Sequence, residues 1–387
     1  MQTIGVFFGS RSPEHDVSIV TGQLIMSGLR EIGRYNVVAV YLTKKGDWLI
    51  GSDLSKLDFF RKGKIDEKKY GPYTLDLTVS DRLVFRKRGV LPQKVEVDLV
   101  FPAFHGQNGE DGTFQGICEI LNVPYVGCDT TASALSMDKV LTKLMYVAEK
   151  IPTTKFIHIT SSRWLEEKSA IMKEAKKLEL PLIVKPARLG SSIGISKARN
   201  AKELEFAIEV ALHYDTKVIV EEMVSNLMDA TVCVIGNDDP VPSLIQESVF
   251  QSEFFSYEDK YLKEGGAQTG NAQKSIVIPA RLNDKTTKEM RNAAVRIYKL
   301  FGCSGIARVD FLYDKKRKTW FANEINTLPG TLYHHLWKKT GVEFKTLLER
   351  LIEYARERHL VRKNITYTFE SSILTQTSST KLSLKGL

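Results

Sequence analysis

The sequence predicts an α/β protein that begins with a parallel, Rossmann-like sheet and continues into two regions of mixed α+β structure. Two observations predict the parallel sheet. An apolar run at 4–8 ends in Gly9-Ser10 and leads into a helical pattern, and a second buried run occupies 36–42. Strand, helix and strand in this order are typical of a βαβ unit. A third observation, two alternating segments joined by a charged turn at 314–318, predicts an antiparallel hairpin.

The other elements of the first 130 residues fit this domain. The helix between the two strands has one apolar side, formed by Val20, Leu24, Ile25, Leu29 and Ile32. The segment VEVDLVFPAF at 95–104 predicts one further buried strand that ends at His105, and a helix is expected from about Thr113. Residues 46–94 are more charged, and we interpret them as an elaboration of the same domain.

A different arrangement is predicted after residue 131. A single long helix is expected at 133–150, and strands and helices then alternate to the end of a last helix at 341–358. We place domain boundaries near residues 131 and 217. The predicted domains are 1–130, 131–217 and 218–362, and they are followed by a Ser/Thr/Lys-rich, loosely ordered tail at 363–387.

Composition excludes several classes of protein. The net charge is +9, but the basic residues fall in short mixed clusters such as 61–69 and 314–318, which argues against a nucleic-acid groove. No run reaches the roughly 20 apolar residues that span a bilayer, and residues 1–10 have the pattern of a strand rather than of a signal peptide. The four cysteines are scattered and form no CxxC pair, so we expect buried thiols in a reducing, cytoplasmic setting.

The hairpin predicts a cation site. Counting inward from the turn sets Asp310 opposite Glu324 and puts Arg308 and Asn326 on the same faces of their strands. Facing carboxylates repel unless a positive charge lies between them, and oxygen donors of this kind suit Mg²⁺ held together with phosphates. The alternative is a polar sheet face with a cross-strand Arg–Glu pair.

A second segment predicts a phosphate site. A buried strand delivers Lys185 and is followed by a loop with glycine at 190 and 194 and serine at 191 and 192. Such a loop lets backbone N–H groups approach an anion, and the lysine adds a point charge. A plain turn between strands is the alternative. The acidic strand at 218–224 is interpreted as the linker that contacts an adenine, with Asp229 near the ribose, or otherwise as an exposed edge strand.

Two short segments of the N-terminal domain follow strands of the predicted parallel sheet. Glu14 and His105 therefore lie at the carboxyl ends of the strands, where open α/β sheets bind ligands. Glu14 could pair with a substrate ammonium group, or could serve only the N-terminus of its helix. His105 could equally be a hydrogen-bonded core histidine.

Taken together, these segments closely resemble the D-alanine–D-alanine ligases of the ATP-grasp superfamily, from about residue 3 to about residue 360. The motifs that carry the resemblance are GSRSPEHDVS (9–18), HGQNGEDGTFQG (105–116), SALSMDKVLTK (133–143), IVKPARLGSSIGISKA (183–198), SYEDKY (256–261), ARVDF (307–311) and NEINTLPG (323–330). The resemblance implies a three-domain ATP-grasp architecture in which two α+β lobes clamp ATP.

The resemblance also implies roles for individual residues. The residues expected to bind ATP are Lys139, Lys185, Ser192, Glu221, Glu222, Met223, Val224, Asp229, Lys260 and Asn323. Asp310, Glu324 and Asn326 would hold two Mg²⁺ or Mn²⁺ ions. Glu14 would bind the ammonium group of the first D-alanine, linked to Ser191 and Tyr261, while Arg308 and the Gly330 N–H would form an oxyanion hole. His105 would line the same substrate site.

The reaction that the resemblance implies is an ATP-dependent ligation of two D-alanines through an acyl phosphate, for peptidoglycan precursor synthesis. Lys260-Tyr261 favours an amine as the acceptor. The loop after Gly330 departs from the family, whose acceptor-binding serine has no direct equivalent. Thr331 and Leu332 take its place if the loop is shortened, and His335 does so by plain counting. We prefer the first alignment because a threonine hydroxyl replaces a serine hydroxyl.

Two other hypotheses stay open. The same chemistry could use another D-amino acid or a D-hydroxy acid as acceptor. The chain could instead be a nucleotide-binding protein with a decayed acceptor site, although Arg308 beside the cation residues argues against this. The resemblance favours a homodimer that works on small molecules.

Overall fold

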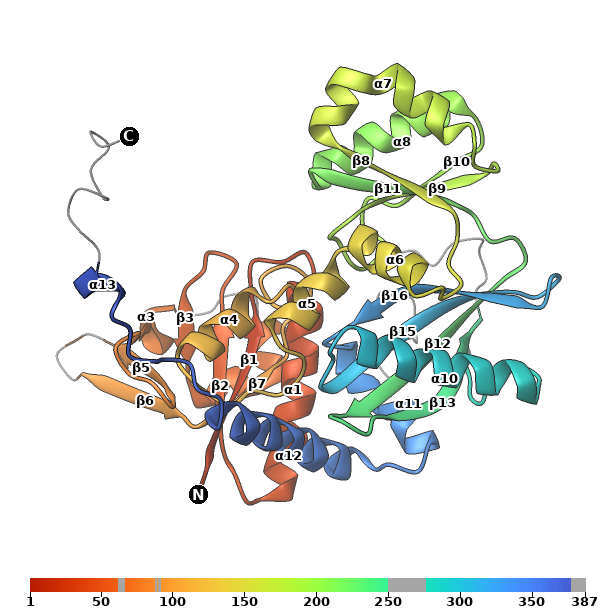
Figure 1. Cartoon of the computed structure of the whole chain (residues 1–387). Coiled ribbons are helices and arrows are strands. Elements are labelled where there is room, and N and C mark those ends of the chain that lie inside the picture. Colours follow the sequence, from red (N-terminus) through yellow and green to blue (C-terminus); the bar gives the residue numbers. More distant parts are fainter. Residues whose placement is uncertain (62–66, 88, 90–91, 250–275, 377–387) are drawn as a thin grey trace, which may run out of the picture.

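The computed structural model describes residues 1–61, 67–87, 89, 92–249 and 276–376. Figure 1 shows an N-terminal domain, a separate upper lobe and a third domain beside both, with the last long helix returning to the N-terminal domain. The chain is α/β with several sheets, as the sequence predicts. Within the described part of the chain, no helix is long and apolar enough to cross a bilayer. All four cysteines are buried free thiols, which confirms the prediction of buried thiols.

The N-terminal domain contains the predicted parallel sheet. Strand β1 (Thr3–Gly9) pairs in parallel with β2 (Asn36–Leu42) on one side and with β7 (Leu99–Pro102) on the other, and α1 (His15–Ile32) packs against β1. The other elements of this domain are β3 (Trp48–Ile50), α2 (Leu57–Arg61), α3 (Glu67–Tyr70), β4 (Thr74–Leu75), β5 (Leu83–Lys87), β6 (Gln93–Val97) and α4 (Thr113–Ile120). Strands β4, β5 and β6 form a small antiparallel sheet of their own.

The prediction of one strand at 95–104 is wrong, because the chain breaks at Asp98. Strand β6 pairs with β5, whereas β7 joins the parallel sheet beside β1. The Asp98 carboxylate accepts a hydrogen bond from the Thr3 N–H at 2.9 Å, and the Asp98 N–H donates to the Thr3 carbonyl at 2.9 Å. Asp98 thus makes two hydrogen bonds with the first residue of β1 at the point where the chain passes from the small antiparallel sheet to the parallel sheet.

The upper lobe in Figure 1 is a four-stranded sheet with two helices on one face. In sheet order its strands are β10 (Ser196–Ala198), β9 (Leu182–Pro186), β11 (Lys217–Glu222) and β8 (Phe156–Thr160). The helices are α7 (Ser161–Ala175) and α8 (Ala201–Tyr214). Because β11 lies between β9 and β8, the chain leaves this sheet only after Glu222. The domain limits themselves stay predictions.

The single long helix predicted at 133–150 is wrong. Two helices, α5 (Thr130–Met137) and α6 (Lys139–Ala148), meet at Asp138, whose carboxylate accepts from the N–H groups of Val140 and Leu141. An aspartate at this position caps a new helix and competes with continuation of the old one. The Lys139 N–H donates to the Ala187 carbonyl at 2.9 Å, so the break brings Lys139 to the Gly/Ser loop.

The third domain is a five-stranded antiparallel sheet. Its strands, in sheet order, are β14 (Ile276–Val277), β13 (Val241–Ser248), β12 (Leu227–Gly236), β15 (Gly305–Asp314) and β16 (Thr319–Asn326). The elements around it are α10 (Asp284–Leu300), η2 (Gly330–Tyr333), α11 (His334–Lys339), α12 (Phe344–Lys363) and α13 (Ile373–Gln376). The sequence patterns did not predict β13 or α11.

Helix α12 joins the third domain to the first. Leu347, Leu348 and Leu351 of α12 are buried in the same apolar cluster as the inner side of α1. At the far end of α12, the Arg358 guanidinium donates to the carbonyls of Tyr125 and Gly127 and to the Ser304 hydroxyl. The two domains therefore share one core.

We predict that Leu348→Ala lowers the free energy of unfolding by about 2–5 kcal/mol, because the Leu348 side chain is fully buried against Gly28 of α1 and its loss leaves a cavity. Urea denaturation followed by fluorescence measures the change. Leu360→Ala on the same helix is the matched control, because Leu360 is 61% exposed. Equal losses in the two variants would contradict the packing of α12 on α1.

Candidate active site

The three domains enclose two connected hollows. The first, which we call the inner cavity, has a volume of about 50 Å³ and lies where all three domains meet. Its charged and imidazole side chains are those of Glu14, His105, Glu110, Lys139, Arg308 and Glu324. The second, the outer cleft, has a volume of about 900 Å³ and lies between the upper lobe and the third domain. A volume of this size suits a nucleotide or a molecule of similar size.

The hairpin has the predicted register. Asp310 pairs with Glu324 and Arg308 with Asn326, which confirms both pairs. A bulge follows, because Phe311 pairs with Ala322 and leaves Asn323 as an extra residue on β16. A bulge re-aims neighbouring side chains, and both Asn323 and Glu324 line the outer cleft. The strand alternation alone would send these two side chains to opposite faces.

Arg308 balances the charge of the facing carboxylates. Its Nε lies 3.0 Å from both Asp310 carboxylate oxygens, and one terminal nitrogen donates to Oδ2 at 2.7 Å. The same guanidinium lies 3.9 Å from Glu324 and 5.1 Å from the centre of the Tyr333 ring. Although burial opposes it, the charge of Asp310 raises the pKa of Arg308, so the guanidinium stays charged.

The donor set of the hairpin fits a hard cation. Asp310 and Glu324 supply carboxylate oxygens, Asn326 adds an amide oxygen, and Asn326 Nδ2 lies 3.2 Å from Asp310. Mg²⁺ prefers such oxygens and completes its shell with substrate phosphates. Across the described ranges, no group of three or more His, Cys, Asp or Glu side chains could hold a metal by itself. A cation bound at the hairpin would take further oxygen ligands from a bound nucleotide or from water.

The Lys185 side chain points into the outer cleft and is held by a buried charge cluster. Glu221 forms ion pairs with Lys143 and Lys185, and the Thr154 hydroxyl donates to it at 2.8 Å. Burial opposes the charge of Glu221, but the two lysines outweigh it and lower its pKa below the ordinary range. The Lys185 ammonium also lies 3.4 Å from Asn323 Oδ1.

The other residues expected to bind ATP line the outer cleft. Glu222, Met223, Val224, Asp229 and Ser192 all contribute to its wall. Glu221 also lines the cleft, but its carboxylate is engaged by the two lysines rather than turned to a base. Lys139 lies between the hollows, where its ammonium donates to the Leu189 carbonyl at 2.6 Å and lies 3.8 Å from Glu324.

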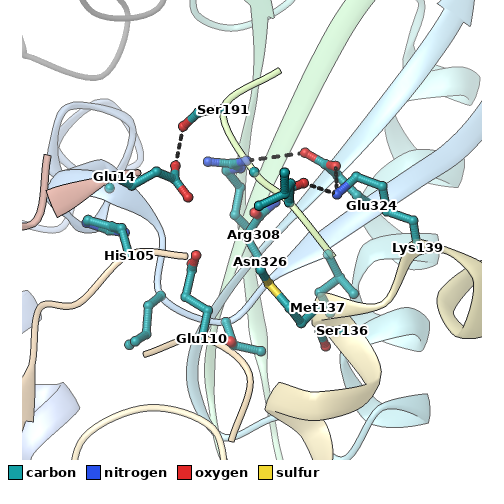
Figure 2. Close-up of a pocket in the computed structure, with 16 residues that line it drawn as sticks. Glu14, His105, Glu110, Ser136, Met137, Lys139, Ser191, Arg308, Glu324 and Asn326 are labelled. Carbon is teal, nitrogen blue, oxygen red and sulfur yellow. Dashed lines mark hydrogen bonds and ion pairs between the residues drawn. The ribbon is translucent and has the colours of Figure 1, made fainter. Parts of the chain in front are cut away.

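Glu14 enters the inner cavity from the start of α1. The Ser191 hydroxyl donates to its carboxylate, which links the Gly/Ser loop to the N-terminal domain (Figure 2). The carboxylate lies against the backbone of Gly106 and Gly190, where an added Cβ would come within 2.8 Å and 2.6 Å of Oε2. A side chain at either position would displace Glu14, and Gly106 also has a positive φ of 75°.

His105 lines the inner cavity beside Glu14. Its Nε2 lies 2.9 Å from the Thr21 hydroxyl. Burial and, to a smaller extent, the charge of Arg308 lower its pKa to about 4. The ring is therefore uncharged at neutral pH, and the histidine presents a neutral wall to a ligand.

In the loop after Gly330, none of the residues considered for the acceptor site lines either hollow. Gly330 lines the inner cavity, but Thr331 and Leu332 line neither hollow. The Thr331 hydroxyl donates to the Gly330 carbonyl, and its N–H donates to the Thr21 hydroxyl at 3.2 Å. His335 Nε2 lies 2.7 Å from Gln246, while Tyr333 lines the outer cleft.

Three consecutive residues of this loop have left-handed backbone conformations, with φ of 50° at Thr331, 54° at Leu332 and 48° at Tyr333. Such conformations are uncommon for side chains of this size and are unfavourable for a β-branched threonine. The roles of Thr331 and Leu332 in substrate binding stay predictions.

Several residues that line the hollows were missed by the sequence reasoning. Glu110, Ser136 and Met137 line the inner cavity, and Lys315 and Tyr333 line the outer cleft. Glu110 lies inside the motif HGQNGEDGTFQG (105–116), two residues before Gly112. A carboxylate next to a loop glycine at the end of a strand is a sequence signal that could have indicated a site residue. Lys260 and Tyr261 lie outside the described residues.

Comparison with known proteins gives one family. Residues 3–128 match the family model "D-ala D-ala ligase N-terminus", and residues 145–353 match "D-ala D-ala ligase C-terminus". A curated protein named D-alanine--D-alanine ligase from Thermosipho melanesiensis is 37% identical over 364 residues, which cover 94% of this chain and 96% of that protein.

Solved structures agree with the family models. The D-alanine-D-alanine ligase from Coxiella burnetii superimposes with a TM-score of 0.79 at 27% identity, over 94% of this chain and 96% of that one. The VanG D-Ala:D-Ser ligase from Enterococcus faecalis has a TM-score of 0.77 at 33% identity, over 92% of this chain and 99% of that one.

We predict that Glu221→Gln lowers the free energy of unfolding at pH 7 by about 3–5 kcal/mol, because it leaves two buried lysines without their partner. The folded-state pKa of Glu221 lies below the ordinary value of about 4.3. The stabilisation that the Glu221 carboxylate contributes is therefore fully present above about pH 4.3, and it is lost as the pH falls from there through the lower folded-state pKa.

Urea denaturation of the wild type and Glu221→Gln at several pH values measures this difference, which should shrink as the pH falls below about 4.3. Glu353→Gln is the control, because the side chain of Glu353 is 59% exposed. A difference that does not change with pH would refute the charge-cluster account.

Proposed function

The chain belongs to the D-alanine–D-alanine ligase family, and we propose that it joins two D-alanines in an ATP-dependent reaction that feeds peptidoglycan precursor synthesis. The observation that carries this proposal is the meeting of the inner cavity and the outer cleft at Arg308, Lys139 and Glu324, which line both. A phosphoryl group bound in the cleft would therefore face a carboxylate bound in the cavity.

ATP would occupy the outer cleft. The backbone of 221–224 suits the adenine edge, Asp229 suits the ribose hydroxyls, and the ammonium groups of Lys139 and Lys185 suit the phosphates. Asp310, Glu324 and Asn326 would hold Mg²⁺ with the phosphate oxygens. Bound there, Mg²⁺ would neutralise charge on the transferred phosphoryl group.

The first D-alanine would lie in the inner cavity. Its ammonium group would pair with Glu14, whose carboxylate is already oriented by Ser191 and by the two glycines beneath it. A carboxylate is a poor electrophile, so its phosphorylation to an acyl phosphate must come first. The amine of the second D-alanine then attacks the acyl carbon.

The attack produces a tetrahedral oxyanion. Arg308 and the Gly330 N–H border the inner cavity and are the donors that would stabilise it. Each such donor is typically worth about 3–4 kcal/mol of activation free energy. Lys260 and Tyr261 are proposed to reach the γ-phosphate and Glu14, respectively.

The alternative function is the ligation of D-alanine to a different acceptor. The similarity to the VanG D-Ala:D-Ser ligase and the altered loop at 331–335 both favour a test with D-serine and with D-hydroxy acids. We also propose a homodimer in the cytoplasm, since the reaction consumes ATP. Light scattering of the purified protein measures the oligomeric state.

The direct assay combines the protein with ATP, Mg²⁺ and a panel of D- and L-amino acids. We expect phosphate release that depends on D-alanine and a product with the mass of D-alanyl-D-alanine. A faster reaction that joins D-alanine to D-serine would select the alternative function. No amino-acid-dependent phosphate release would contradict both.

Glu324→Gln should lower kcat by at least about 100-fold, because loss of one cation-binding carboxylate removes several kcal/mol of charge stabilisation from phosphoryl transfer. Steady-state kinetics over a range of Mg²⁺ concentrations measures the effect. Glu289→Gln on the exposed face of α10 is the control and should keep normal kinetics. A normal rate in Glu324→Gln would refute the cation assignment.

We propose that the Thr331 hydroxyl, which donates to the Gly330 carbonyl in this structure, turns to the acceptor's carboxylate when the acceptor binds. Thr331→Ala should then raise the KM for the acceptor by about 10-fold or more, because a hydrogen bond to a charged group is lost. Initial rates at saturating ATP give this value. His335→Ala is the matched comparison, since His335 is the position reached by plain counting. An increase in KM for His335→Ala alone would show that the shortened-loop alignment is wrong.

A further inference from the structure

Glu110 supplies a second carboxylate to the substrate side of the inner cavity. Figure 2 shows its carboxyl group pointing into the space that Glu14, His105 and Arg308 also face. The residue comes from the loop between β7 and α4, whereas Glu14 comes from the start of α1. Two acidic groups from separate segments therefore meet at one small cavity.

The backbone of Gly106 contacts both carboxylates. Its N–H donates to Glu110 Oε2 at 2.7 Å, and a Cβ on Gly106 would lie only 2.8 Å from Glu14 Oε2 and 2.5 Å from the Ser12 hydroxyl. Glu110 is therefore oriented by a main-chain bond rather than by a flexible side chain. With this bond in place, Glu110 lines the cavity together with Glu14.

In the proposed reaction, the second ammonium group still needs a negatively charged partner, and Glu110 is the carboxylate of the cavity that has no other role. Two amino acids must enter, and each brings an ammonium group. Glu14, Glu324, Arg308 and Lys139 all line the cavity. In the proposed reaction Glu14 would pair with the first ammonium group, Glu324 would bind the cation, and Arg308 and Lys139 would face the oxyanion and the phosphate. His105 is neutral at neutral pH because its pKa is lowered to about 4.

We propose that Glu110 binds the ammonium group of the acceptor amino acid and accepts its proton, so that the free amine can attack the acyl phosphate. This inference rests on the proposed function. One proton passes from the acceptor's ammonium nitrogen to Glu110, and the free amine then forms the C–N bond to the acyl carbon. The second proton passes from this nitrogen to the phosphate. The bond between the acyl carbon and the bridging oxygen breaks, and its electron pair stays on the phosphate oxygen.

The surroundings of Glu110 suit this task. Burial, and next the negative charge of Glu14, raise its pKa above the ordinary glutamate range. A carboxylate with a raised pKa is a stronger base, and general bases work best when their pKa is near the working pH. Glu14, Arg308, Glu324, Lys139 and His105 are the charged and titratable groups that line the cavity with it.

Hydroxylamine separates this step from the formation of the acyl phosphate. It is an uncharged nucleophile at neutral pH, so it traps the acyl phosphate as D-alanine hydroxamate without needing a base. Glu110→Gln removes the negative charge, yet its amide oxygen can still accept the bond from Gly106. We expect dipeptide formation to fall by about 100-fold or more, as general-base catalysis predicts, while hydroxamate formation stays within about twofold of the wild type.

Three further variants make the outcome specific. Glu14→Gln should lose both products, because it removes the partner of the first ammonium group. Asp111→Asn makes the same isosteric change one residue along, where the carboxylate accepts from the N–H groups of Asn108 and Thr113, and should keep both products. Glu110→Asp retains the charge and should form more dipeptide than Glu110→Gln.

The results for Glu110→Gln and for the wild type test different proposals. A parallel fall of dipeptide and hydroxamate in Glu110→Gln would mean that Glu110 only supports the loop, and unchanged dipeptide formation would mean that it has no role in the acceptor step. Either result overturns the inference. Wild-type protein that forms neither product contradicts the proposed function instead, so the two failures are distinguishable.

Discussion

The proposed active site depends on two carboxylates, Asp310 and Glu324, that face each other across a hairpin. Such a pair is unfavourable unless positive charge is supplied. Arg308 supplies part of it through its two-point contact with Asp310, and Lys139 lies 3.8 Å from Glu324. The remaining demand for positive charge is what makes this hairpin suitable for a cation and its phosphate ligands.

The rest of the molecule forms a hollow on either side of this pair, and we propose that each hollow binds a different ligand. The upper lobe and the third domain form a cleft large enough for a nucleotide, and the N-terminal domain brings Glu14 and Glu110 to the smaller cavity. The core shared by α1 and α12 fixes the N-terminal domain against the hairpin. The transferred group therefore has a short path between the two hollows.

The sequence predicted those features that depend on local rules. Asp310 and Glu324 were paired correctly because a hairpin with a short turn has few possible registers. The helix break at Asp138 does not follow from the apolar pattern, because it is made by the extended backbone of Asp138 and the capping bonds of its carboxylate. The engagement of Glu221 by Lys143 and Lys185 depends on tertiary contacts, as does the position of Glu110 beside Glu14, so neither followed from spacing.

The measurement that tests the central claim most directly is the transfer of heavy oxygen from the carboxylate of labelled D-alanine. If the facing carboxylates, Lys139 and Lys185 bring ATP and D-alanine together as described, the acyl phosphate forms and then breaks between its acyl carbon and the bridging oxygen, which leaves with the phosphate. Mass spectrometry of the released phosphate should then find one labelled oxygen for each dipeptide made. Unlabelled phosphate, with the label retained in the dipeptide, would contradict an acyl phosphate and the site arrangement built on it.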